Sequence, residues 1–533
     1  MMQRKWKITL IVCAGVFMAS LDLFIVNIAF PSIAKHFNHA SLGSLSWIVS
    51  GYAIVFAALL VPAGRWADAF GRKRAFLLGL GIFVLASVGC AFAPSVGFLI
   101  AARLVQAGGG ALMLPTSLGL ILPEFAASER HVAIGVWAAT GGIAAATGPP
   151  LGGLLVQADW RLVFLVNVPV GLAALVMGAR VLNERREAHA LRPDLVSALG
   201  FTIAIGALVL AIVNGQSWGW TSLPVLLLLA TPAVLLPAIW RRSEHHDSPL
   251  IDPAMLRVRS FSLAVSASVL FFAGFAAMLL SGVLFLTGVW HESVLIAGLM
   301  LFPGPFMATL FSIPSARLGA RVGYRIPGVI GALMFASAAV FWITQTGDTP
   351  AYLTQYLPGT LISGAGVGLV IPTLTGAGAS SLPPERFATG AAVLTMGRQV
   401  GSALGIAILV AVLGTAATTA ADFHSAWKIC LVGGLSAGVA LASLGPAVRR
   451  RAPAEPAPEV AVASGVAAGP GLTPGSGLAP ASGVAPGPGL GPASGLAPAS
   501  GLAPASGVTP ASGVAPASGV APGPGPAMIE ASA

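Results

Sequence analysis

The chain has 533 residues, of which 56% are hydrophobic and only 9% are charged, with 28 Lys and Arg against 18 Asp and Glu. A soluble domain carries roughly 25% charged residues, so this composition excludes an ordinary soluble protein and indicates a membrane protein. Its basic residues form short clusters between apolar runs, a pattern that excludes a nucleic-acid partner. Cys13, Cys90 and Cys430 lie in apolar stretches, which leaves no disulfide framework and no paired metal spacing.

Apolar runs of membrane-spanning length fill the first 451 residues. Each has roughly 18 to 25 residues, enough for a helix to cross about 30 Å of hydrocarbon. The signal is weakest for the pair at 195–241 and for the turns near Pro94 and Trp160. These fourteen runs predict an all-α polytopic membrane protein with spans at 8–30, 46–66, 75–94, 97–122, 132–156, 161–182, 195–214, 222–241, 260–287, 294–315, 326–346, 351–377, 387–414 and 426–447.

The basic residues follow the alternation of the spans. If the amino terminus is cytoplasmic, almost all Lys and Arg fall on the cytoplasmic side, as the positive-inside rule requires. The exceptions are Lys35, Arg161 and Lys428 on the outer side and Arg103 and Arg398 inside spans. We therefore predict a multi-pass protein of the cytoplasmic (inner) membrane with both termini cytoplasmic. No Gly-Lys-Ser/Thr phosphate-binding loop occurs, so an ion gradient is the predicted energy source for uphill transport.

Residues 452–533 differ in composition from the rest of the chain. Ala, Pro, Gly and Ser dominate, in a recurring six-residue unit such as Ala-Ser-Gly-Leu-Ala-Pro. The tract lacks the large apolar side chains that offset the entropy of ordering, so a disordered cytoplasmic tail is predicted. A flexible appendage without activity is favoured over a partner-binding proline tract.

Asp22 is the one acidic residue that we predict deep inside a span. Burial disfavours its charged form, which makes Asp22 a candidate proton carrier; the alternative is a structural hydrogen bond, for example to Tyr52 on the next span. Arg103 and Gln106, three residues apart in the fourth span, share a helical face. Because an arginine within a span needs a cavity or a partner, a functional role is favoured over structural pairing.

Two short basic segments follow the second and tenth spans. The first has Asp68 where a helix meets a tight turn, and this carboxylate could pair with a basic residue or a helix amino terminus across a domain seam. The second segment, 316–325, repeats the pattern with Ala320 in place of the aspartate, as expected for a fold of two repeated halves. The residues of interest in the first segment are Gly64, Asp68, Gly71, Arg72 and Lys73.

The fifth span carries a stripe of small residues. Gly141, Ala145, Gly148 and Gly152 follow one another at steps of four, three and four, which allows close contact with a neighbouring helix. Two adjacent prolines after Gly148 are expected to bend the span.

These motifs together resemble those of the major facilitator superfamily, in particular its fourteen-span drug:proton antiporter branch. Segment 64–74 is similar to the family's signature loop, 103–110 to its Arg-x-x-Gln-x-x-Gly motif, and 146–153 to the Gly-Pro-x-x-Gly-Gly element of exporters. The resemblance covers residues 8–447 and does not include the tail. Further stretches that fit this branch are 21–31, 160–171 and 397–401.

The resemblance implies the major facilitator fold, with two six-helix bundles and two inserted helices. The first bundle is expected at 1–194, the inserted pair at 195–241, the second bundle at 242–451 and the tail at 452–533. It also implies a conformational latch in the first basic segment and proton coupling through Arg103, to which we add Asp22. The implied antiporter motif consists of Gly148, Pro149, Gly152 and Gly153.

The predicted function is proton-coupled export of amphipathic drugs or antibiotics by alternating access. Substrate contacts are expected from Asn27, Gln106, Arg398, Gln399 and apolar walls. One deep carboxylate and two deep arginines favour neutral, anionic or monocationic substrates over dications. No enzymatic activity, cofactor or metal is predicted, and a monomer is expected to function.

Two alternatives remain open. The first is a nutrient or metabolite importer or facilitator, against which the exporter-like element at 148–153 argues. The second is a polytopic membrane enzyme, for example an acyl transferase that uses scattered residues.

Overall fold

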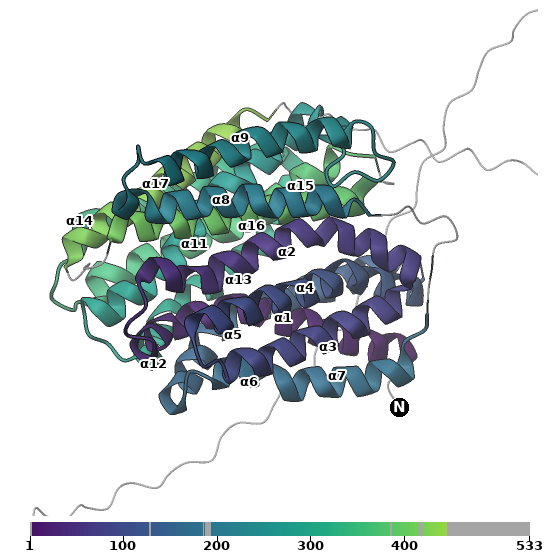
Figure 1. The fold of residues 1–533 in the computed structure, drawn as a ribbon, viewed down its shortest axis with the longest axis horizontal. Coiled ribbons are helices and arrows are strands. Elements are labelled where there is room, and N and C mark those ends of the chain that lie inside the picture. Colours follow the sequence, from purple (N-terminus) through teal and green to yellow (C-terminus); the bar gives the residue numbers. More distant parts are fainter. Residues whose placement is uncertain are drawn as a thin grey trace, which may run out of the picture. The chain divides into compact units, whose positions relative to one another are not determined.

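The computed structural model describes residues 3–126, 129–184, 186, 193–383, 386–414 and 419–444. The regular structure within these ranges is entirely helical (Figure 1). The chain divides into two compact units, 1–452 and 453–533, and the second lies outside the described residues, as does the predicted tail. The helices are α1 (Arg4–His36), α2 (Leu42–Phe70), α3 (Arg72–Ala91), α4 (Val96–Ile121), η1 (Leu122–Glu124), α5 (Arg130–Ala158), α6 (Leu162–Leu165), α7 (Asn167–Val181), α8 (Leu195–Trp218), α9 (Leu223–Ser243), α10 (Pro253–Leu256), α11 (Arg259–Gly288), α12 (Val294–Leu301), α13 (Pro303–Val322), α14 (Arg325–Gln345), η3 (Tyr352–Tyr356), α15 (Leu357–Ser380), α16 (Phe387–Leu413) and α17 (Ala420–Ala442).

Fourteen helical stretches of the described chain are long and apolar enough to cross a membrane, which confirms the predicted number. Their ends and continuity differ from prediction in places. The tenth span is split into α12 and α13, where Pro303, which has no backbone N–H to donate, begins the second helix. The last span starts at Ala420 instead of 426, because Thr419 and Asp422 form a capping box there. Lys428, expected in an outer segment, therefore lies inside α17.

The helices pack as two groups. In the first bundle, α1–α7, helix α4 packs against α2 and α3, and α1 packs against α5 and α7. In the second bundle, α11–α17, α11 packs against α16 and α17, and α15 packs against α13 and α14. The pair α8 and α9 pack on each other, and α8 also contacts α2 and α16 (Figure 1). Fourteen helices in this arrangement support the predicted fold class, whereas the chain divisions at 194 and 241 remain predictions.

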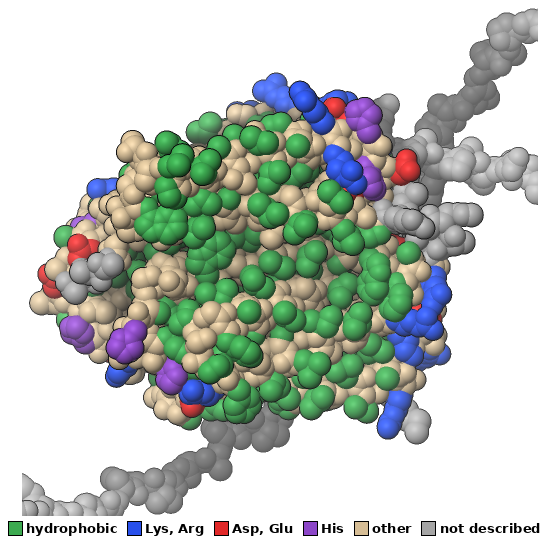
Figure 2. Space-filling view, viewed as in Figure 1, with side chains coloured by type: hydrophobic (Ala, Val, Ile, Leu, Met, Phe, Trp, Pro, Cys, Tyr) green, Lys and Arg blue, Asp and Glu red, His purple; other side chains and the backbone are tan. Residues whose placement is uncertain are grey.

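Basic side chains gather at one end of the helices. We name as the basic end the side where α1 starts and α2 turns into α3, and as the distal end the side where α5 ends and α12 starts. Figure 2 shows Lys and Arg side chains clustered toward the end that carries the amino terminus in Figure 1, with apolar side chains across the middle of the face. An apolar belt between polar ends is what a lipid-embedded protein requires.

The two bundles share an apolar core toward the distal end. One buried cluster joins Ile25, Ala29 and Ile33 of α1 to residues along the second bundle, including Leu280 of α11 and Ala297 of α12. The half of the first bundle nearer the basic end forms a separate buried cluster around α1, α3 and α4. Contact between α5 and the second bundle is likewise stronger at α12 than at α13. The bundles are therefore closed against each other at the distal end, and a third buried cluster joins α2 to α16 along the middle of the helices.

Candidate functional site

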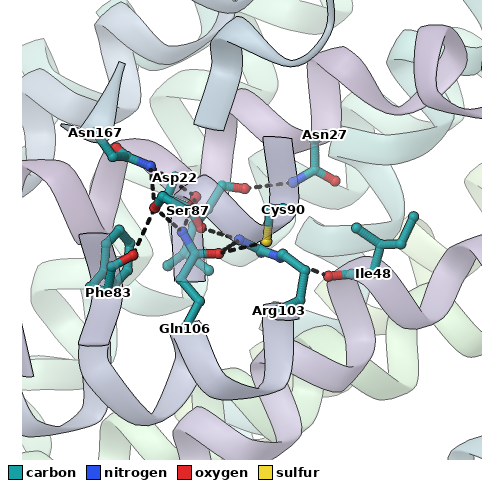
Figure 3. A network of polar contacts seen from close by, with 10 residues as sticks. Asp22, Asn27, Ile48, Phe83, Ser87, Cys90, Arg103, Gln106 and Asn167 are labelled. Carbon is teal, nitrogen blue, oxygen red and sulfur yellow. Dashed lines mark hydrogen bonds and ion pairs between the residues drawn. The ribbon is translucent and has the colours of Figure 1, made fainter. Parts of the chain in front are cut away.

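The candidate site is built around Asp22, in the middle of α1. Asp22 is fully buried, and its Oδ2 accepts a hydrogen bond from Arg103 Nη1 of α4, so that the two side chains form an ion pair. Arg103 is also fully buried. Figure 3 shows the two side chains pointing toward each other. A buried ion pair is stable only when its remaining polar atoms are also hydrogen-bonded.

Three polar side chains provide those hydrogen bonds. Gln106 Nε2 donates to Asp22 Oδ1 over 3.0 Å and to Ser87 Oγ over 2.9 Å, while Gln106 Oε1 accepts from Arg103 Nη1 over 2.7 Å. Asn167 Nδ2, at the start of α7, lies 3.4 Å from both Asp22 Oδ1 and Ser87 Oγ (Figure 3). Helices α1, α3, α4 and α7 of the first bundle therefore meet in one polar network.

Arg103 has further contacts with α2. Its Nε donates to the carbonyl oxygen of Ile48 over 3.0 Å, and its guanidinium carbon lies 4.2 Å from the centre of the Tyr52 ring. The hydrogen bond suggested between Asp22 and Tyr52 is wrong, because Tyr52 Oη is buried without a partner. The ring instead presents its face to the Arg103 guanidinium in a cation–π contact.

The network pairs one negative charge with one positive charge. The opposite charges of Asp22 and Arg103 compensate each other in a buried site. A proton on Asp22 would remove the negative charge and weaken the charge-assisted bonds that tie α1 to α4. The contact between α1 and α4 thus depends on the charge of Asp22.

Sequence reasoning missed two members of the network, Ser87 and Asn167. Both are buried polar residues in otherwise apolar runs, which is the signal that could have identified them. Asn167 lies in the 160–171 stretch, although no role was assigned to it. Cys90 also contacts the network, with Sγ 3.8 Å from Gln106 Oε1.

The other predicted substrate contacts lie outside the network. Asn27 Nδ2 donates to the carbonyl oxygen of Leu23 over 2.7 Å, and Asn27 Oδ1 is buried without a partner. Arg398 and Gln399 are on α16 of the second bundle, where the guanidinium carbon of Arg398 lies 4.6 Å from the centre of the Phe272 ring. Gln106, by contrast, is a full member of the network, and its amide is occupied by protein partners.

The predicted latch segment contacts other residues of the first bundle. Asp68 pairs with Arg72, four residues later, over 2.9 Å, instead of reaching across the seam between the bundles. Lys73 Nζ donates to the carbonyl oxygen of Ala179 over 2.8 Å at the end of α7. Gly71 has φ +120°, a conformation that favours glycine, and Gly323 in the second basic segment has φ +94°. The two segments therefore share the same kind of turn. Gly64 faces Pro115 of α4, since a Cβ on Gly64 would lie 3.3 Å from Pro115 Cβ.

The small residues of α5 contact two different helices. A Cβ on Gly148 would lie 2.7 Å from Phe24 Cβ, and one on Gly152 would lie 2.9 Å from Ile25 Cγ1, so both glycines face α1. A Cβ on Gly153 would lie 2.8 Å from Leu295 Cα of α12, in the second bundle.

Two other positions complete the contacts of this motif. The carbonyl group of Pro149 lies against Gly298 of α12. Gly141, the first residue of the predicted stripe, makes no close helix contact, because no atom lies within 4 Å of a Cβ added there. The motif at 148–153 thus joins α1 to the other bundle.

A buried charge network and a tight contact between two helical groups, both within a fourteen-helix body, define a polytopic membrane transporter. Sequence comparison assigns the chain to the same class of protein. The chain belongs to the Major Facilitator Superfamily, whose sequence model matches residues 12–406. As a member of this family, the chain is a transporter and not an enzyme.

Several similar proteins are named for drug resistance. The chain is 34% identical over 415 residues to "Multidrug resistance protein Stp" of Mycobacterium tuberculosis, covering 77% of this chain and 76% of that protein. It is 33% identical over 410 residues to the "Tetracenomycin C resistance and export protein" of Streptomyces glaucescens, with 76% and 75% covered. It is 35% identical over 425 residues to "Puromycin resistance protein pur8" of Streptomyces alboniger, with 78% and 83% covered.

Solved structures show the same fold at low identity. A D-xylose–proton symporter superposes with a TM-score of 0.59 at 16% identity, covering 83% of this chain and 98% of the symporter. A POT family transporter superposes with a TM-score of 0.60 at 14% identity, with 81% and 94% covered. At these identities the likeness establishes the fold alone.

Proposed function

We propose that this chain exports amphipathic drugs or antibiotics across the cytoplasmic membrane in exchange for protons. The relatives named for resistance and export support the drug-efflux part of this proposal. The observation that carries the proton-coupling part is Asp22, the only fully buried carboxylate inside a membrane-length helix among the described residues. Such residues mark proton and substrate pathways in membrane proteins.

Asp22 would bind the proton, and Arg103 would set how readily it does so. When Asp22 is ionised, Arg103 holds α1 against α4; when Asp22 is protonated, that attraction is lost. The residues of α1 that follow Asp22 by two and three positions pack on Gly148 and Gly152 of α5. Because α5 also contacts α12, a movement of α1 would reach the contact between the bundles.

The basic end would face the cytoplasm, as the positive-inside rule requires. The structure, closed at the distal end, would then be the state that receives substrate from the cytoplasm. Asp68 would act in the opposite state, where closure of the basic end brings the latch segment against the second bundle. A single chain, with the amino terminus and the tail on the cytoplasmic side, would carry out the cycle.

Substrate would bind between the bundles. Asn27, Arg398 and Gln399 each offer a polar group that is not satisfied by the protein, whereas Gln106 would act by positioning Asp22. We assign the inserted pair α8 and α9 to the outside of the seam between α2 and α16, where α8 contacts both helices.

Expression in an efflux-deficient bacterium tests the proposal. A susceptibility screen identifies the compound to which the chain gives most resistance, and accumulation of that compound is then followed with and without an uncoupler. Wild-type cells should keep accumulation low until the uncoupler is added, and Asp22→Asn cells should accumulate the compound throughout. Asp159→Asn, which removes a carboxylate paired with Arg161 at the distal end, is the matched control and should behave as wild type. Uncoupler-sensitive efflux at the wild-type rate in Asp22→Asn cells would rule out the proton role.

A further inference from the structure

The positive charge of Arg398 lies within a membrane-length helix and has no acidic partner among the residues that the structure describes. Its one contact of charge type is the Phe272 ring; no hydrogen bond or ion pair of its guanidinium exists among the described residues. Arg103 differs, because its charge is compensated by Asp22. A guanidinium carries five N–H donors, and leaving them unpaired within a span is unfavourable unless a ligand or water uses them.

The position of Arg398 on α16 shows which side of the helix carries its charge. Met396, Val400, Ala403 and Ala407 are buried and pack in one cluster with α2 and α8. Most residues that remain partly or fully exposed along this stretch fall on the other side of the helix, at steps of three or four, and form one stripe. The stripe consists of Ala391, Thr395, Arg398, Gln399 and Ser402, whereas Ala392 and Leu404, which are also partly exposed, pack against the cluster with α2 and α8.

This stripe carries donors and lacks negative charge. Gln399 Nε2 is buried without a partner, one residue from Arg398. The side chain of Thr395 donates to the carbonyl oxygen of Ala391, so its hydroxyl does not neutralise the arginine. The buried Phe272 ring packs against the Arg398 guanidinium and makes its surroundings apolar on that side. An aromatic ring with an anionic oxygen substituent would use the arginine, the amide and the apolar surface together.

We propose that Arg398 is the residue that selects substrates by charge, and that this transporter prefers amphipathic molecules with an acidic or strongly electronegative oxygen over lipophilic cations. The inference rests on the proposed function and narrows its substrate class. The charges of Asp22 and Arg103 compensate each other, whereas the positive charge of Arg398 has no acidic partner among the described residues. That charge repels a cation and attracts an anion in a site of low dielectric.

Three probes with one aromatic frame test the proposal without any gradient. Anthracene carboxylate, anthracene methanol and aminomethyl anthracene carry one negative charge, no charge and one positive charge at neutral pH. Their affinities for the purified full-length protein are measured by fluorescence. Wild type should bind the carboxylate roughly ten- to hundred-fold more tightly than the alcohol, and the aminomethyl compound most weakly.

Variants separate charge from geometry. Arg398→Gln should lose the preference for the carboxylate while keeping affinity for the alcohol, and Arg398→Lys should retain part of the preference. Arg325→Gln removes the same charge from the exposed start of α14 and should keep the full preference. Equal elution volume in size-exclusion chromatography confirms that each variant folds.

Each outcome of these measurements either overturns or supports the inference. An unchanged carboxylate preference in Arg398→Gln, equal affinity for the three probes, a preference for the aminomethyl compound or binding of none of them overturns the inference. Loss of the preference in Arg398→Gln alone supports it. Failure of proton coupling would be seen in transport assays and would leave this binding preference unchanged, so the two proposals fail separately.

Discussion

The Asp22–Arg103 pair is tolerated inside the membrane because its polar atoms are hydrogen-bonded from several sides. Gln106 and Asn167 bond to the carboxylate, while Ile48 and Gln106 bond to the guanidinium. Removing one partner of such a pair leaves an uncompensated buried charge, whereas removing both charges leaves only imperfect packing. Removing one charge should therefore lower the stability of the protein more than removing both.

We expect Arg103→Met to destabilise the protein by about 3–5 kcal/mol, because Asp22 is then left buried without its counter-charge. The double variant Asp22→Asn with Arg103→Met should be more stable than Arg103→Met alone. Thermal unfolding in detergent, compared across wild type, both single variants and the double variant, measures this coupling. A double variant that is no more stable than Arg103→Met would mean that the ion pair does not hold α1 and α4 together.

The sequence predicts Asp22, Arg103 and Gln106 as candidate site residues but does not predict how they are arranged. Periodicity places Arg103 and Gln106 on one face of α4, and this much the structure confirms. The partnership with Asp22 joins residues 81 positions apart, and it depends on how α1 packs against α4. No local pattern contains that information, which is why Tyr52 was a reasonable but wrong partner.

At the scale of helices, α5 is the element that joins the two bundles. Gly148 and Gly152 bring it close to α1, and Gly153 brings it close to α12. A larger residue at Gly153 would meet the backbone of α12, and one at Gly148 or Gly152 would meet side chains of α1. The motif at 148–153 therefore has a steric reason for its small residues, independent of any family resemblance.

We expect Gly153→Leu to open the distal end, because the added side chain would overlap the backbone of α12 at Leu295. A cysteine introduced at Leu295, in a background without the three native cysteines, should then react several-fold faster with a maleimide. Gly141→Leu is the matched control, since Gly141 has free space around it, and it should leave the labelling rate unchanged. Equal rates in both variants would show that the distal contact does not depend on Gly153.

A cap and an ion pair at the start of α8 tie the two inserted helices, α8 and α9, together. Asp194 caps this helix by accepting from Ser197 N over 3.1 Å, and it pairs with Arg242 of α9 over 3.0 Å. Burial raises the pKa of Asp194, but the hydrogen bonds from Ser197 and the charge of Arg242 outweigh it and hold the pKa below its ordinary value. The carboxylate is therefore stabilised in the folded protein.

Asp194→Ala should reduce stability by about 1–2 kcal/mol at neutral pH, and Asp194→Asn should cost less because Asn also caps helices. Because the folded-state pKa is the lower one, the stabilisation is present above the unfolded pKa of about 3.9 and is lost as the pH falls through the folded value. Melting temperatures of wild type and Asp194→Ala should thus converge below about pH 4. A constant difference across this range would contradict the role of the charge.

Helix existence was more predictable than helix continuity. Each span is a long apolar run, so its presence follows from composition, and even the weak pair at 195–241 exists as α8 and α9. The break at Pro303 and the cap at Thr419 depend on single residues, and they shifted or split predicted spans.

For the whole molecule, the sequence indicates the number of spans and the end that carries the basic residues. It does not reveal that the bundles close at the distal end. That closure follows from the contact of α5 with α12 and from a shared apolar core, both of which join distant parts of the chain. Asp68 was expected across the seam, but in this conformation it pairs within its own bundle with Arg72.

Alternating access powered by protons requires that substrate movement and proton movement depend on each other. Purified protein in proteoliposomes, with an imposed pH gradient and a fluorescent record of internal pH, measures both at once. We predict that substrate moves against its own gradient only while the pH gradient lasts, and that adding substrate accelerates proton flow in wild type but not in Asp22→Asn. Equal substrate movement by wild type and Asp22→Asn with every ion gradient collapsed would contradict the account.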